Sequence, residues 1–220
     1  MKYFIVILTL LFATTITIAG VSQDVAQLQK RWAEVNYILE GKDQNKAFED
    51  LIQQADKVVV SYPTAAESLI WRGIIKSSYA GAKGGLGAIS LAKASKADLE
   101  QAITINDKAL SGSALTSLGT LYFKVPGWPI GFGNDDKAKK MLEKALVLNP
   151  DGIDSNYFYA DFLSDQGKHK EAEQYLLKAQ QAPARPDRPL ADKGRHEEIL
   201  ALLKHVRDKQ RVVTNASTFY

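Results

Sequence analysis

Two stretches near the end of the chain repeat one pattern of small and large residues at a fixed distance of 34 positions. The matching positions are Ala138, Leu142, Ala145 and Pro150, then Ala172, Leu176, Ala179 and Ala184. Residues four and seven positions apart share one face of an α-helix, so each stretch carries a small–large–small stripe that a partner helix can approach closely. Repeats of this period are typical of helical hairpins, which bury their apolar faces by stacking on one another.

Looser copies of the pattern precede these two. Leu99 and Ala102 match Leu142 and Ala145 at a distance of 43, so this copy carries nine extra residues. A degenerate first unit, with Ala47-Phe48, Leu51 and Ala55, ends at Pro63. Three to four hairpins are therefore expected before a last helix. The apolar face of that helix, Ile199, Leu202, Leu203 and Val206, is typical of a cap on a helical array.

The helical period and its stop signals predict nine helices and no strand. The expected ranges are 23–40, 44–61, 65–79, 89–105, 111–123, 135–148, 153–163, 169–180 and 190–208. Two long interruptions are expected to be loops. Gly81–Gly87 lies inside the second unit, and Lys124–Asn134 carries about seven residues more than a plain repeat needs. Residues 210–220 are expected to form a frayed tail.

The first 19 residues read as a secretory signal peptide. Lys2 supplies the positive start, no charge follows from Tyr3 to Gln23, and Thr17-Ile18-Ala19 offers small residues for cleavage after Ala19. The alternative is an uncleaved membrane anchor, but four threonines dilute the apolar run. We therefore expect a periplasmic or secreted protein that meets a membrane, if at all, only through an uncleaved leader.

The residues that usually carry chemistry are missing from the required patterns. There is no cysteine, and His169, His196 and His205 do not stand at metal-ligand spacing. The glycine run lacks the Gly-Lys-Ser/Thr of a phosphate-binding loop, and no serine occupies a nucleophile elbow. A net charge of +3, with both signs mixed, argues against nucleic-acid binding. The sequence thus predicts no catalytic residues, no cofactor and no metal.

Aromatic and basic residues in the loops are the candidates for binding. The loop residues Trp128 and Phe132 either close over a ligand or partner, or fold back to plug the array. We expect the structural role for Trp128, in which case Trp128→Ala would lower the unfolding free energy by about 3–5 kcal/mol. Arg185 and Arg188 either hold an anionic group or pair with Asp187 or Asp192. The candidate binding residues are Tyr122, Trp128, Pro129, Phe132, Tyr157, Tyr159 and Arg185.

The repeat residues together with the long loop resemble a known family. The 34-residue period resembles the tetratricopeptide repeat. Leu118-Gly-Thr-Leu-Tyr122 followed by Pro126-Gly-Trp-Pro-Ile-Gly-Phe-Gly133 is similar to exported bacterial proteins of this class, among them the T component associated with TRAP transporters. The resemblance covers roughly residues 67–207 and implies an all-α solenoid. We expect the helical domain to span residues 20–209 and to end in a C-terminal capping helix. The T components are often lipid-anchored through a cysteine, which this chain does not have.

The expected function follows from this class of fold. A helical array without a catalytic signature indicates a periplasmic scaffold that binds another protein through its concave surface. The alternative is a ligand-binding accessory protein of a TRAP-type transporter, which would hold a small organic ligand. A closed apolar pocket lined by Tyr122, Trp128 and Phe132 would favour the carrier, and a wide groove would favour a protein partner.

Overall fold

A computed structural model describes the backbone of residues 2–217 and the side chains of residues 20–85 and 87–212. Within the described residues the chain forms nine α-helices, one short 3₁₀ turn (η1) and no strand. The elements are α1 (Lys2–Tyr37), α2 (Gly41–Ser61), α3 (Ala66–Lys83), α4 (Gly85–Asn106), η1 (Ala109–Gly112), α5 (Ser113–Lys124), α6 (Asp135–Leu148), α7 (Ile153–Asp165), α8 (His169–Gln180) and α9 (Pro189–Ser217).

Consecutive helices pack as hairpins: α1 with α2, α3 with α4, α5 with α6, and α7 with α8. The predicted register is confirmed, because the small–large–small positions of α6 and α8 are fully buried. These residues are Ala138, Leu142, Ala145, Ala172, Leu176 and Ala179. In the second and third hairpins the first helix supplies a complementary glycine. A Cβ atom at Gly119 would lie 2.7 Å from Leu142 Cγ, and one at Gly73 would lie 2.8 Å from Leu99 Cγ. The two helices therefore cross at these glycines.

The interruption expected at Gly81–Gly87 is not a loop. Helix α3 continues to Lys83 and α4 begins at Gly85, so Gly84 alone separates them. Gly84 and Gly85 both have a φ of +62°, a conformation that glycine adopts without steric cost. The extra residues of this unit lengthen the two helices, because Ala80, Ala82 and Lys83 are good helix formers around an isolated glycine.

The second interruption is a loop, as predicted, and hydrogen bonds hold it in place. The amide of Asn134 donates to the carbonyl of Tyr122 at 2.7 Å, and that of Gly133 donates to Pro126 at 2.9 Å. A Cβ atom at Gly133 would lie 2.0 Å from the carbonyl oxygen of Val125, so only glycine fits there. The Asn134 side chain caps α6 by accepting from the amide of Lys137. The loop is thus a fixed part of the third hairpin.

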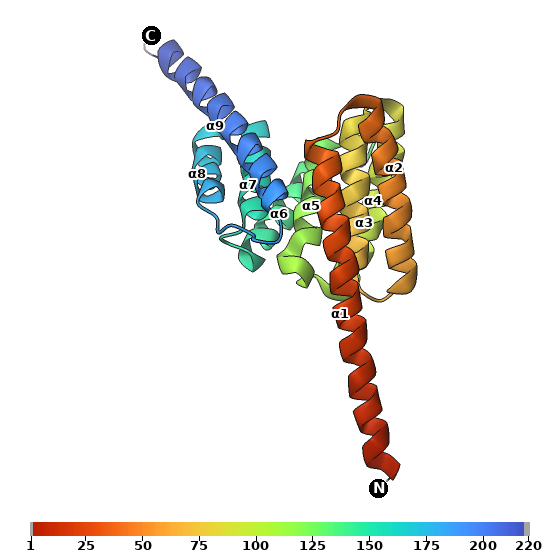
Figure 1. Ribbon diagram of the computed structural model, residues 1–220. Coiled ribbons are helices and arrows are strands. Elements are labelled where there is room, and N and C mark those ends of the chain that lie inside the picture. Colours follow the sequence, from red (N-terminus) through yellow and green to blue (C-terminus); the bar gives the residue numbers. More distant parts are fainter. Residues whose placement is uncertain (1, 218–220) are drawn as a thin grey trace.

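The hairpins form two halves that face each other, α1–α4 on one side and α6–α9 on the other, with α5 between them (Figure 1). Two apolar clusters fill the array, one centred on Phe48, Leu51 and Ile75, the other on Leu118, Leu142 and Leu176. Helix α9 packs on α7 and α8 and also touches α1. The first and last helices therefore meet across the concave side of the array.

Both terminal helices extend beyond the packed body (Figure 1). Helix α1 runs without a break from Lys2 to Tyr37, and Val21 is the first described side chain that is buried. Helix α9 continues to Ser217, past residue 209, where the tail was expected to begin. A search of the described residues finds no helix with the length and apolarity needed to cross a bilayer.

Candidate binding cleft

A cleft of about 950 Å³ opens on the concave side of the array. Its walls come from α1, α3, α4 and α5, from the start of α7, and from the 183–188 link and α9. Helices far apart in the sequence therefore contribute to one cleft. Its size lies at the upper end of the range for pockets that bind small molecules.

Buried aromatic rings line the side of the cleft formed by α1 and α3. Trp32 and Trp71 pack edge to face with their ring centres 5.8 Å apart, and Tyr37 packs against Trp32 at 5.6 Å. The indole nitrogen of Trp32 donates to Ser78 Oγ at 2.8 Å. The two tryptophans form a stiff apolar surface, because each is held by the other across the α1–α3 contact.

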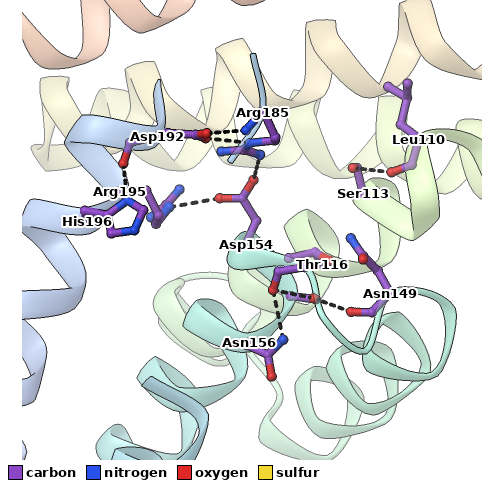
Figure 2. Close-up of polar contacts among 12 residues, drawn as sticks. Leu110, Ser113, Thr116, Asn149, Asp154, Asn156, Arg185, Asp192, Arg195 and His196 are labelled. Atoms are coloured by element: carbon purple, nitrogen blue, oxygen red, sulfur yellow. Dashed lines mark hydrogen bonds and ion pairs between the residues drawn. The ribbon is translucent and has the colours of Figure 1, made fainter. Parts of the chain in front are cut away.

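Charged residues line the part of the cleft formed by α7, the 183–188 link and α9, and Asp154 lies at the centre of this group (Figure 2). Its two carboxylate oxygens accept hydrogen bonds from different arginines, from Arg185 Nη1 at 2.6 Å and from Arg195 Nε at 2.9 Å. Arg185 also donates from Nε to Asp192 at 2.6 Å. Arg195 pairs with Glu198 as well. This network joins α7, the 183–188 link and α9.

Burial and charge together set the pKa values of this network. Burial raises the pKa of Asp154, but Arg195 and Arg185 outweigh it and hold the pKa well below its usual range. Burial lowers the pKa of Arg195, and Asp154 outweighs that effect, so the guanidinium stays charged. Burial raises the pKa of Tyr37 to about 12. Asp154 is therefore an anion at neutral pH.

A strained turn shapes the floor of the cleft. Leu110 and Ser111 both have positive φ values, 47° and 54°, and both line the cleft. Residues other than glycine pay about 1 kcal/mol or more to adopt this conformation. The hydroxyl of Ser113 donates to the carbonyl of Leu110 at 2.6 Å, which helps to hold the turn. Two adjacent residues of this kind beside a cleft are consistent with a shape maintained for binding.

The structure brings only two of the predicted binding residues into the cleft, Tyr157 and Arg185. The Tyr157 ring lies 4.4 Å under the guanidinium of Arg195. Tyr159 is buried on the other face of α7, against Tyr175 at 4.8 Å. Tyr122 is buried inside the third hairpin, and Phe132 packs on it edge to face at 5.8 Å. Phe132 is thus the aromatic residue that folds the loop back onto the array.

The plug role expected for Trp128 is wrong. Its side chain is 90% exposed, and neither it nor the exposed Pro129 lines the cleft. Backbone hydrogen bonds and the packing of Phe132 already fix the loop. Trp128 is not needed for this and points outward. The anticipated pocket lined by Tyr122, Trp128 and Phe132 is therefore not the cleft of this molecule.

Sequence reasoning missed most of the side chains that build the cleft. No sequence pattern distinguishes Trp32, Tyr37 and Trp71 from ordinary core aromatic residues, and an aspartate such as Asp154 is common in the first turn of a helix. Arg195 gave no signal beyond its charge. Within the part of the chain whose side chains are described, no group of three or more metal-binding side chains is placed to hold an ion. The cleft offers apolar surface, hydrogen-bonding groups and charge.

One family of known proteins matches part of the chain. The tetratricopeptide repeat family matches residues 153–184, which span α7, α8 and the start of the link to α9. No curated protein sequence is significantly similar to the chain. Among solved structures, the crystal structure of MamA is similar, with a TM-score of 0.44 and 18% identity over 79% of this chain and 95% of that one. The predicted fold class, an all-α tetratricopeptide-like solenoid with a C-terminal capping helix, is confirmed.

Proposed function

We propose that the chain is a tetratricopeptide-type binding protein that holds a segment of another protein in the concave cleft. The observation that carries the proposal is the cleft itself, which joins a buried aromatic surface to a row of hydroxyl and amide groups. The polar groups are supplied by Asn36, Ser77, Ser117 and Thr120. Side chains of this kind can hydrogen-bond the backbone of a bound segment, while the aromatic surface buries its apolar residues.

Site-specific photocrosslinking in the native host tests this proposal. A benzoylphenylalanine at Ser117, inside the cleft, should give a discrete protein adduct that mass spectrometry identifies. The same group at Lys140, an exposed position on α6, is the matched control and should not give it. Adding Thr120→Trp, which fills the cleft one helical turn away, should abolish the adduct. Equal labelling from both positions, or no protein adduct at Ser117, would contradict the proposal.

The alternative is a ligand-binding accessory protein of a TRAP-type organic-acid transporter. The cleft volume of about 950 Å³ supports it, because pockets of about 300–1,000 Å³ hold small molecules. Native mass spectrometry of the protein purified from its host distinguishes the two functions. A small molecule that accompanies the parent and is lost in Thr120→Trp would favour the carrier over the scaffold.

We further propose that the protein is exported and that its leader is removed after Ala19. The extension of α1 beyond the body supports this, because the segment that cleavage would remove runs away from the other helices (Figure 1). Cleavage would leave Gly20 as the first residue, packed against the hydroxyl end of Tyr62. Mass spectrometry of the periplasmic fraction should show a chain that starts at Gly20. An intact Met1 in the membrane fraction would instead establish the uncleaved anchor.

A further inference from the structure

Arg188 is a cation in the wall of the cleft. It lies in the link just before α9 and is partly buried. Its guanidinium carbon stands 5.1 Å from the ring centre of Trp71, and its Nε atom is buried without an acceptor among the described residues. No carboxylate of the described part of the chain lies within ion-pair distance of it. Burial and the neighbouring charge of Arg185 lower the pKa of Arg188.

The other two arginines of the cleft show what Arg188 lacks. Arg185 is bound by Asp154 and Asp192, and Arg195 by Asp154 and Glu198. A partly buried cation is normally paired in this way, because removing it from water is costly. The three carboxylates are committed to Arg185 and Arg195, so Arg188 remains a source of positive charge in the cleft.

A second hydrogen-bond donor beside Arg188 also lacks a protein acceptor. The side chain of Trp71 is 3% exposed and lines the cleft, and its indole Nε1 is buried without a hydrogen-bond partner in the described residues. Buried N–H groups in native proteins are nearly always satisfied. Two donors without a protein acceptor therefore belong to neighbouring side chains, with the Arg188 guanidinium carbon 5.1 Å from the Trp71 ring centre, and this arrangement suits an anionic acceptor.

We propose that Arg188, held over Trp71, is the subsite that receives the carboxylate of an aspartate or glutamate in the bound segment. This inference rests on the proposed function and names the chemistry by which the cleft recognises its partner. A carboxylate suits the site because its two oxygens match the planar fork of a guanidinium. The neighbouring walls of Ile74 and Ala191 are apolar, so the acidic residue should be flanked by an apolar one.

The backbone and ring contacts fix Arg188 before any partner arrives. Its amide donates to the carbonyl of Arg185 at 2.9 Å, and its own carbonyl accepts from the amide of Asp192 at 3.0 Å. Stacking on Trp71 restricts the guanidinium further. Since less side-chain entropy is lost on binding a prearranged group, the site is suited to recognise a single carboxylate.

Two matched tetrapeptides test the subsite on the whole mature protein. Acetyl-Ala-Asp-Phe-Ala-amide and its Asn counterpart differ only in the charge of one side chain. Binding is measured by NMR from the arginine Nε–H resonances and from the indole resonance of Trp71. The Asp peptide should shift Arg188 and Trp71 and bind at least tenfold more tightly than the Asn peptide. If neither peptide shifts these resonances at millimolar concentrations, or if both bind equally, the inference is overturned.

Three variants separate the subsite from general effects of charge or stability. Arg188→Gln should remove the preference for Asp, while Arg211→Gln, an exposed arginine near the end of α9, should retain it. Trp71→Phe keeps an aromatic platform without the indole N–H and should reduce the preference only partly. Arg188→Lys keeps the charge, loses the fork and should also give a partial effect. An Arg188→Gln protein that melts like the parent but still prefers Asp would contradict the inference.

The outcomes distinguish this inference from the function on which it rests. A preference for Asp that depends on Arg188, with no protein adduct at Ser117, would keep the carboxylate subsite and reject the scaffold. If acetate alone shifts the Arg188 resonance as strongly as the Asp peptide does, the site takes small acids and not a protein segment. A protein adduct at Ser117 that Arg188→Gln leaves unchanged would keep the scaffold and reject the subsite.

Discussion

At the scale of single residues, exposure decides which tryptophan stabilises the fold. Trp128 is 90% exposed, whereas Trp71 is 3% exposed against Trp32 and Arg188. Trp128→Ala should therefore change the unfolding free energy by less than about 0.5 kcal/mol, as is usual for exposed substitutions. Trp71→Ala should lower it by about 3–5 kcal/mol. Urea unfolding of both variants measures these changes. An equal loss of unfolding free energy in the two variants would contradict the exposed position of Trp128.

Asp154 is the residue on which the charged wall depends. Asp154→Asn should lower the unfolding free energy by about 3 kcal/mol at pH 7, because it leaves two arginines without their shared partner. We expect the low end of the usual range, since a third of the Asp154 side chain is exposed. The exposed Asp151 supplies the control, and Asp151→Asn should have little effect.

The contribution of Asp154 should also depend on pH. Burial raises the pKa of Asp154, but the arginines lower it by a larger amount. The pKa in the folded protein therefore lies below the unfolded value of about 3.9. A depressed carboxyl stabilises the fold above the unfolded pKa and loses that effect as the pH falls towards the folded pKa. The difference in unfolding free energy between the parent and Asp154→Asn should therefore be constant from pH 7 to 5 and shrink below pH 4. A gap that stays constant down to pH 3 would exclude this linkage.

At the scale of the helix, two glycines of α3 should respond in opposite directions to the same substitution. A Cβ atom at Gly73 would meet Leu99 at 2.8 Å, whereas one at Gly81 would meet nothing within 4 Å. Gly73→Ala should cost about 1–3 kcal/mol through overpacking of the hairpin. Gly81→Ala should gain about 0.5–1 kcal/mol, because alanine orders a helix at a lower entropic cost. Thermal melts of the two variants test whether α3 and α4 cross at Gly73. A lower melting temperature in both variants would contradict this position of the crossing.

At the scale of the whole molecule, the contact between α1 and α9 closes the cleft. Gly194 fits against Tyr37, since a Cβ atom there would lie 2.4 Å from the ring. Gly194→Leu should push α9 away from α1, lower the melting temperature and speed hydrogen exchange along both helices. Lys193→Leu places the same side chain at a position that is 75% exposed and should do neither. Unchanged exchange in Gly194→Leu would mean that the cleft closes without this contact.

The sequence by itself determined the helices, their hairpin pairing and the register of their buried faces. Each of these depends on residues a few positions apart or on the adjacent helix, as with Leu142 and Leu176, so periodicity and spacing were enough to predict them. Local rules also misled at Gly81–Gly87, because a run of glycines weakens a helix without preventing one.

Tertiary structure decided which side chains meet across the cleft. Asp154 finds Arg185 31 positions and Arg195 41 positions along the chain, and Arg188 finds Trp71 from the other half of the array. Such pairs depend on the superhelical turn that accumulates over four hairpins, which no local pattern encodes. The outward position of Trp128 has the same origin. The helices against which a loop packs decide which of its side chains are buried and which are exposed.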